Sequence, residues 1–589
     1  MKNDVSPVNG PAHKLPHWLQ DWFMLAGAYV ILLVIFLSTT HLWPNNAEDW
    51  LRGTPVSLSL CGIAGGLTTV CWHLVRRLFS FNHLTFKRLL FVFVCLSTLV
   101  ALLYAEEDWR GWHAWHQFKR EWEAKGETFF LASVAPAPVP DEQNFATTPI
   151  VASSYEALFD QTGKEFSPHL TNVVNRMDFD LEVDSKLADF PGNNGDWRQA
   201  TFVNLATWQT YFQTMALKTN HFPAHAQPQS PAADVLLALS AFAPGLEELR
   251  VASQQPYSRF PLNYEKEPSS SILLPHLAPL KRAAQTLRLR TVAELQASQP
   301  ALALEDIKLS LRLGDSIRTE PFLISHLVRI AMLQIALQPV WEGLARHQWS
   351  EAQLVTLDTE LAKLDFAVDY QLALRGEQAM CCTEVDQMRR HRKLIGQMAA
   401  DVNSDNPSTL ATPSSLLPAG WFYQNELHFA QLMSGYYLPV ADVKQGAFSP
   451  ALARECVAAV KAESQSPSPF NLLIRMTSVE VNNLAVRFAQ AQASATLART
   501  AIALERYHLR HNEYPATLDA LTPEFLATAP KDAINGTPLK YQRTASGQFL
   551  LYSVGWNETD DGGSITFSKG KTPQIDNLHG DWIWRYPEP

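Results

Sequence analysis

Three apolar runs near the start of the chain dominate its hydrophobic pattern. They cover residues 23–42, 56–75 and 89–104, and none of them contains a charged side chain. A helix rises about 1.5 Å per residue, so roughly 20 apolar residues cross a hydrocarbon core about 30 Å thick. The pattern therefore predicts three transmembrane helices within residues 23–104, after a short polar tail at residues 1–22.

The loops between these runs differ in charge. Arg52 lies between the first and second runs, next to two acidic residues. The second and third runs are separated by four basic residues, Arg76, Arg77, Lys87 and Arg88. Because an excess of Lys and Arg marks the cytoplasmic side, we expect a cytoplasmic N-terminus. Residues 105–589 would then lie outside the cytoplasm, as the periplasmic part of a multi-pass inner-membrane protein.

The second run contains a G-x-x-x-G pattern at Gly62 and Gly66. Glycines at this spacing let the backbones of two membrane helices approach closely. The pattern favours packing among the three predicted helices, and the alternative is a homo-oligomer that forms through the same face.

Residues 105–149 predict an interfacial helix followed by an extended connector. The predicted helix contains Trp109, Trp112, Trp115 and Trp122, and those at i, i+3 and i+6 share one face, which suits the membrane–water boundary. Residues 134–149 are rich in proline, and this composition is typical of an extended linker.

Residues 178–184 alternate acidic and apolar side chains. The period of two predicts a strand with one solvated face. Four carboxylates on one face could hold a cation, but such a row is more often only a water-facing surface.

Between residues 201 and 398 the apolar residues recur at helical spacing. Short breaks separate these segments, so the pattern predicts antiparallel helical hairpins in a body that covers residues 150–470. His326 lies alone on an apolar stretch and is interpreted as a core histidine. Residues 401–420 and 463–469 are rich in Ser, Pro and Asn and predict loops.

The C-terminal residues 484–589 change from a helical pattern to short strands. A long helix is expected over residues 484–512, followed by strands around residues 537–542, 547–555 and 581–586. The overall fold class is therefore mixed: a three-helix transmembrane N-terminus, a mainly α-helical soluble body and a small α+β C-terminal domain.

Particular motifs in this C-terminal region carry a family resemblance. ALERYHLRHNEYPATLDAL is followed by NGTPLKY, FLLYSVGWN, TDDGG and a final DWIW. In this order they resemble the globular head of the major pseudopilin of type II secretion. The resemblance covers about 100 of the 589 residues. The helix at residues 484–512 is polar, so the resemblance implies the head fold and not assembly into a filament.

The same resemblance implies a calcium-binding loop. The four side chains that match the family's ligands are Asn557, Asp560, Asp561 and Asp581. Calcium takes six to eight oxygen ligands, which carboxylates, amides and backbone carbonyls can supply. The alternative is an Asp-Gly turn without an ion, because Asp and Gly are the commonest turn residues.

Composition limits the classes of function. The 589 residues are 47% hydrophobic and 18% charged, as in a packed protein. The net charge of −10 argues against nucleic acid as a partner, because phosphate binding requires clustered Lys and Arg. Three of the six cysteines, Cys381, Cys382 and Cys456, lie outside the apolar runs. Free buried thiols are favoured, and a disulfide to Cys456 is the alternative.

The chain contains no G-x-S-x-G, H-E-x-x-H, P-loop or G-x-G-x-x-G motif. Its histidines are interpreted as scattered, with His508 and His511 lacking an acidic partner at ligand spacing. The favoured hypothesis is a membrane-anchored, non-enzymatic envelope protein with a secretion-type protein partner. The alternative is a membrane-bound hydrolase whose cleft lies within residues 150–440.

Overall fold

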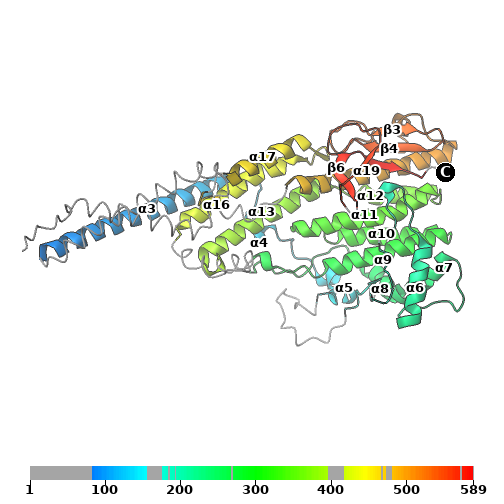
Figure 1. Cartoon of the computed structure of the whole chain (residues 1–589), viewed down its shortest axis with the longest axis horizontal. Helices are drawn as coiled ribbons and strands as arrows, with labels where there is room; N and C mark the ends of the chain where they lie inside the picture. Colours follow the sequence, from blue (N-terminus) through cyan, green and yellow to red (C-terminus); the bar gives the residue numbers. More distant parts are fainter. Residues whose placement is uncertain are drawn as a thin grey trace, which may run out of the picture. The chain divides into compact units, whose positions relative to one another are not determined.

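A computed structural model of the whole chain gives its architecture (Figure 1). The residues it describes are 83–155, 175–182, 186–192, 194–219, 221–266, 269–395, 417–465, 468–471, 481–570 and 573–587. They are mainly helical, with a few small sheets. The chain divides into two compact units, Met1–Glu106 and Glu107–Pro589.

In the first unit the described residues belong to α3 (His83–Glu123). This helix contains the third predicted span, and an 18-residue window of it is long and apolar enough to cross a membrane. None of that window is buried in protein. The exposed apolar side chains are Leu90, Phe91, Phe93, Val94, Leu96, Leu99, Val100, Leu102 and Leu103. The other two predicted spans, with Gly62 and Gly66, lie outside the described residues.

One further described helix, α11 (Leu323–Ala345), is also long and apolar enough to span a membrane. Two thirds of its apolar window, however, is buried inside the second unit. α11 packs against α9 (Leu277–Gln296) and α10 (Pro300–Asp315), and the three lie side by side in Figure 1. It is therefore a core helix of the body.

The packing of α9, α10 and α11 against one another confirms the helical body that the apolar spacing predicts. Pro300 occupies the first turn of α10, where its missing N–H costs nothing. Five shorter helices belong to the body, of which α7 contacts α9 and α4 contacts α13: α4 (Leu131–Val134), α5 (Pro149–Ala152), α6 (Leu205–Thr219), α7 (Pro231–Leu239) and α8 (Ala243–Ala252). The remaining helices of the body are α12 (Glu351–Leu361), α13 (Phe366–Arg390), α16 (Ala419–Leu432) and α17 (Pro450–Gln465).

The C-terminal region begins with α19 (Val481–His511), close to the predicted bounds. The three predicted strands are present as β3 (Lys540–Arg543), β4 (Phe549–Ser553) and β7 (Trp582–Arg585). They form one antiparallel sheet in the order β3-β4-β7. Two small sheets pair β1 (Ala441–Asp442) with β2 (Ala447–Phe448) and β5 (Ile565–Phe567) with β6 (Ile575–Gly580).

α19 joins the C-terminal sheet to the body. It contacts α11, α12 and α13 of the body, as well as β4, β6 and β7. Many of its buried positions are alanines, among them Ala485, Ala489 and Ala498, and these small side chains let neighbouring elements approach closely. One continuous hydrophobic core runs through the body and the C-terminal sheet. The predicted head is thus fixed to the body by a shared core.

The tryptophan-rich segment differs from its prediction. It is the continuation of α3 and not a separate interfacial helix. Trp115 is buried against Phe129, whereas Trp109 and Trp112 are exposed. Asp108 Oδ1 accepts a 2.7 Å hydrogen bond from the Gly420 backbone N–H at the start of α16. This segment therefore packs on protein through one face and leaves two tryptophans at the surface.

Two further sequence predictions are wrong. The residues around Phe179 and Leu181 form no strand in the described part of 178–184, although both side chains are buried between exposed or half-exposed acids. The proline-rich residues 134–149 are not an extended connector throughout, because they contain two short 3-10 helices, Asp141–Gln143 and Phe145–Thr147. Phe145 is fully buried, and the Phe145 N–H donates to Tyr257 O at 2.8 Å, so this segment packs on the body.

The cysteines and His326 match the favoured interpretations. Cys381, Cys382 and Cys456 are buried, and they form no disulfide in the described part of the chain. Burial raises the pKa of the Cys456 thiol to about 12, so the thiol stays protonated. His326 is fully buried, and its Nε2 lies 2.9 Å from Glu320 O. Burial lowers its pKa to about 3, so it is a neutral core histidine.

Glu377 on α13 gives the fold a pH dependence. Burial raises its pKa from 4.5 to about 7, and the Leu323 N–H at the start of α11 donates to its carboxylate. The folded protein therefore keeps a proton that the unfolded chain releases as pH rises from about 4.5 to 7, so this group lowers stability as pH rises. We expect Glu377→Gln to raise the free energy of unfolding at pH 8 by on the order of 1–2 kcal/mol.

At pH 4 the two chains should differ little, because both carry an uncharged side chain at this position. Denaturant melts at the two pH values measure the difference. A gain that is equal at pH 4 and pH 8 would contradict burial of the carboxylate as its cause.

Candidate functional site

The predicted calcium loop connects β4 to β5, and Asp581 precedes β7. Asp581 is buried, and its two carboxylate oxygens accept hydrogen bonds from three backbone N–H groups, those of Asp561, Gly563 and Ser564, at 3.3, 2.7 and 3.4 Å. Gly563 has a φ of +75°, which glycine adopts without strain. The Asp581 side chain therefore holds the backbone of the loop in place.

The other predicted ligands do not converge with Asp581 on one point. Asp560 faces away, because its oxygens accept from Tyr552 OH at 2.9 Å and contact Lys540 Nζ at 3.1 Å. Asn557 Nδ2 donates to Asp561 Oδ2 at 2.9 Å. These residues satisfy one another and do not fit calcium as a ligand set in this arrangement. Calcium binding by the loop stays a prediction.

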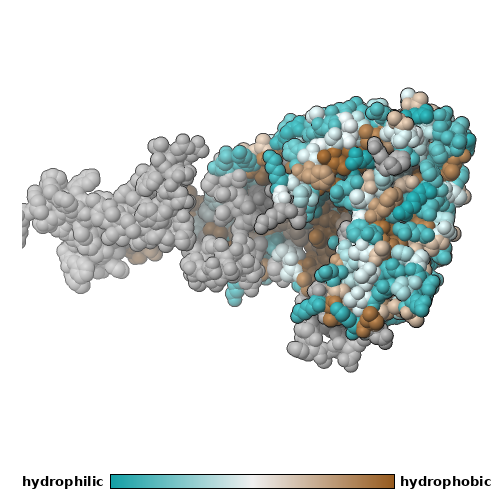
Figure 2. Space-filling view, turned by 45° about the vertical axis from the view of Figure 1, so that its right-hand side comes forward, coloured by the Kyte–Doolittle hydropathy of each residue, from teal (hydrophilic) through white to brown (hydrophobic). Residues whose placement is uncertain are grey.

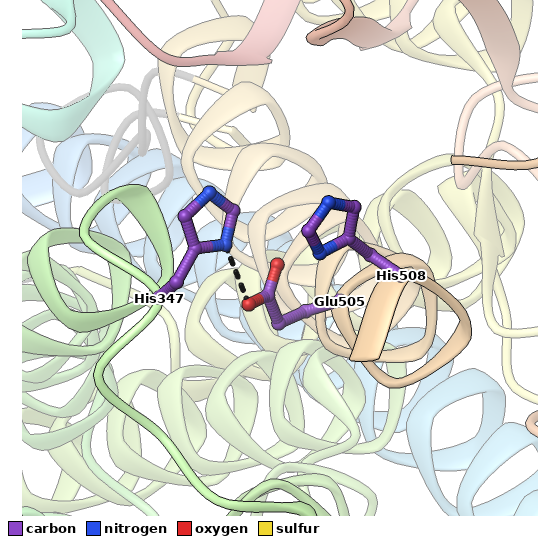
Figure 3. Close-up of side chains that lie close together, drawn as sticks. All are labelled: His347, Glu505 and His508. Carbon is purple, nitrogen blue, oxygen red and sulfur yellow. Dashed lines mark hydrogen bonds and ion pairs between the residues drawn. The ribbon is translucent and has the colours of Figure 1, made fainter. Parts of the chain in front are cut away.

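A different group of side chains does converge: His347, Glu505 and His508. Each offers one ligand atom, and these atoms all lie within 4.8 Å of one another, the one such group of three or more His, Cys, Asp or Glu among the described residues. His347 Nδ1 lies 2.8 Å from Glu505 Oε1. Figure 3 shows both imidazole rings turned toward the Glu505 carboxylate.

Two separate parts of the chain position this cluster. Glu505 and His508 are three residues apart on α19, so they share one face of the helix. His347 lies in the turn between α11 and α12, where it adopts a left-handed φ of +52°. The turn is fixed because Trp349, the second residue after His347, is buried against Gly343 of α11.

Aromatic rings and one hydroxyl surround the carboxylate. Tyr514 OH donates to Glu505 Oε2 at 3.0 Å. The rings of His347 and His508 stack with centroids 5.0 Å apart, and His508 also lies 4.8 Å from the Tyr514 ring. Burial raises the pKa of Tyr514, so its hydroxyl remains a hydrogen-bond donor.

Charge and exposure differ across the cluster. Glu505 is buried, whereas 38% of the His347 side chain is exposed, so the cluster opens to solvent on the His347 side. The hydrogen bond with Glu505 raises the pKa of His347, against the lowering effect of partial burial. His508 Nδ1 is buried without a hydrogen-bond partner among the described residues.

The interpretation that His508 lacks an acidic partner is therefore wrong. Glu505 lies three residues before it, and this E-x-x-H spacing on a predicted helix was the signal that could have been found. His347 is 158 residues away from Glu505 in the sequence, so no local pattern connects them.

Two features of the body bear on the hydrolase hypothesis. A cavity of about 310 Å³ lies within the predicted range, and its charged lining residues are Asp180, Glu182, Arg282 and Arg288. Elsewhere, the Ser325 hydroxyl donates to Glu320, and His276 Nε2 lies 2.7 Å from the other Glu320 oxygen. All three are buried, and the carboxylate separates the hydroxyl from the imidazole, unlike a nucleophile–base pair. This second group is a buried polar cluster within the core.

Comparison with known proteins gives no relative: no protein-family model, no curated protein and no solved structure matches the chain.

Proposed function

We propose that this chain is a membrane-anchored envelope protein whose residues 107–589 act outside the cytoplasm as a non-enzymatic interaction body. The observation that carries the proposal is the exposed apolar surface of α3. Its large side chains between Leu90 and Leu103 face away from protein, which is unfavourable in water at roughly 25 cal/mol per Å². A lipid bilayer removes that cost.

Two surface features support the membrane boundary and the aqueous body. Trp109 and Trp112 are exposed just beyond the apolar stretch, and tryptophan favours the membrane–water interface. Figure 2 shows that hydrophobic residues on the visible face of the body are dispersed among hydrophilic ones. This distribution is typical of a surface in contact with water.

The resemblance of the C-terminal region to a pseudopilin head supports a role in protein–protein contact, because that family works by assembly. The core that α19 shares with the body and the C-terminal sheet joins the head to the body, so a partner that binds the head is held next to the body. The basic loop between the second and third apolar runs supports the orientation with a cytoplasmic N-terminus. Gly62 and Gly66 support a homo-oligomer in the membrane.

Membrane fractionation tests the anchor. After an alkaline carbonate wash, we expect the full chain to stay in the membrane pellet and to leave it only with detergent. Recovery of the chain in the wash would show that it is peripheral.

Co-purification tests the partner and the loop together. Detergent extracts with and without a calcium-selective chelator should yield the same secretion-type envelope proteins if the loop needs no ion. A partner lost only with the chelator would establish the calcium loop, and a chain that brings down no partner in either extract would contradict the interaction role.

The cavity beside Asp180 and Glu182 favours the hydrolase as a second candidate. Asp180 Oδ2 lies 3.5 Å from Arg282 Nε, so the cavity holds both signs of charge. Hydrolysis of a panel of ester, amide and phosphate substrates that Glu182→Gln abolishes would support this candidate. Hydrolysis that Glu182→Gln leaves unchanged would exclude this cavity as the active site.

A further inference from the structure

We propose that His347, Glu505 and His508 bind one transition-metal dication of the zinc class where α19 meets the turn between α11 and α12. This site is independent of the membrane anchor and of the predicted calcium loop, so its failure would leave the proposed function unchanged.

The donor atoms select the class of metal. Two imidazole nitrogens and one carboxylate oxygen suit Zn²⁺ and related borderline cations, whereas calcium and magnesium prefer all-oxygen ligand sets. Three protein ligands leave a fourth position open for water. The exposed side of His347 provides a route from solvent to that position.

The distances require only small shifts: the closest pair of ligand atoms would move slightly apart, and the wider pairs would move together. In a tetrahedral zinc site with bonds of about 2.0–2.1 Å, neighbouring ligand atoms lie roughly 3.3 Å apart. His347 Nδ1 and Glu505 Oε1 are 2.8 Å apart, and every pair of ligand atoms in the cluster is within 4.8 Å. A modest rotation of the His508 ring would bring the third ligand into range, because both rings already face the carboxylate (Figure 3).

His508 Nδ1 is the observation that goes beyond proximity. Buried polar atoms nearly always have a partner, and this nitrogen has none among the described residues. It has a lone pair available when the ring carries its proton on Nε2. A metal ion next to Glu505 would give this nitrogen the partner it lacks.

A supporting shell is already in place. Tyr514 OH donates to Glu505 Oε2 and fixes the carboxylate plane, while Oε1 contacts His347 Nδ1, where a metal would replace the proton that the two atoms share. Such second-layer hydrogen bonds orient metal ligands, and their loss commonly costs 10–100-fold in affinity. The ligands come from two elements far apart in the sequence, so bound metal would tie α19 to the α11–α12 turn.

The test uses the full chain, purified in detergent and freed of metal with EDTA that is then removed. Calorimetric titration should show one Zn²⁺ per chain. In a thermal unfolding experiment, the bound Zn²⁺ should raise the melting temperature. Co²⁺ in place of Zn²⁺ should give the visible absorption bands of a four-coordinate site. His347→Ala should weaken Zn²⁺ binding by roughly tenfold or more. Glu505→Gln should remove the cobalt bands.

His511→Ala is the matched control, because His511 lies one turn further along α19 and is exposed. It should bind Zn²⁺ as the unmodified chain does. His347 lies at the surface, so His347→Ala is expected to fold, and an unchanged melting temperature of the metal-free protein would verify this. The test therefore does not depend on whether Glu505→Gln folds. An unmodified chain that takes up no Zn²⁺, or a His347→Ala chain with unchanged affinity, would overturn the proposal.

Discussion

Replacing Asp306 by alanine is expected to lower the free energy of unfolding by about 3 kcal/mol. Asp306 on α10 is 1% exposed and is contacted by two arginines from neighbouring helices. Arg250 Nη2 lies 2.7 Å from Oδ1, and Arg290 contacts both oxygens at 2.5 and 2.6 Å. The variant removes the carboxylate that both guanidinium groups share, and leaves the longer contacts of Arg250 with Glu247 at 3.4 Å and of Arg290 with Glu294 at 3.8 Å. Because both arginines keep partial access to water, we expect the lower end of the range for broken buried ion pairs.

Glu305→Gln is the matched control for this prediction. Glu305 is the preceding residue on the same helix, and it pairs with Lys308 at the exposed surface. Exposed pairs contribute about 0–1 kcal/mol, so this variant should unfold close to the unmodified chain. Chemical denaturation in detergent measures both. Equal, small losses in the two variants would show that the Asp306 contacts do not hold α8, α9 and α10 together.

Replacing Gly376 by alanine is expected to cost about 3 kcal/mol, the upper end of the range for overpacking. Gly376 lies within α13, and a Cβ added there would lie 1.5 Å from Pro321 O and 2.5 Å from Pro321 C. Both clashing atoms belong to the backbone of the α10–α11 connection. A backbone cannot rotate away as a flexible side chain can, so the helix would have to move.

Gly314→Ala serves as the control, because Gly314 is also helical and has room for a methyl group. The nearest atom to its added Cβ is Met332 Cβ at 3.8 Å, an ordinary contact. Alanine favours a helix over glycine by about 0.5–1 kcal/mol, so this variant should be as stable as the unmodified chain or slightly more so. If Gly376→Ala and Gly314→Ala have the same melting temperature, α13 does not pack this closely on the α10–α11 connection.

The helices of the body could be predicted because their signals are local. Pro300 marks the start of α10, and Ser350 with Gln353 forms a capping box at the start of α12. The strands β4 and β7 were found for a similar reason, since they are short runs of aromatic and branched side chains next to turn residues. β5 was missed because it has only three residues, and β6 because Asp576, Asn577 and His579 interrupt its apolar pattern.

The sequence predictions failed where one local pattern is compatible with two different structures. An alternation of acidic and apolar residues is expected for a strand, but an extended loop that buries Phe179 and Leu181 has the same alternation without a strand partner. Similarly, proline-rich composition indicated a linker, while Phe145, Ile150 and Val151 provided enough apolar surface to dock it. Composition describes backbone stiffness and does not decide whether a segment packs.

The candidate site shows most clearly what cannot be predicted from the sequence. Glu505 and His508 could have been identified from their spacing on a predicted helix, but the third member comes from a turn in another part of the chain. Only the folding of α19 against α11 and α12 brings His347 to Glu505. The ligands predicted for calcium, in contrast, are adjacent in sequence, but the backbone directs Asp560 and Asp581 to different partners.

The sidedness of the membrane anchor is the central claim, and labelling with a membrane-impermeant maleimide tests it most directly. Ala545 is exposed in the turn between β3 and β4, and Asp4 belongs to the polar N-terminal tail. In intact spheroplasts, we expect Ala545→Cys to react well above the background of the native thiols. Asp4→Cys should react only after permeabilisation. Labelling of Asp4→Cys in intact spheroplasts, with Ala545→Cys protected until lysis, would contradict the account.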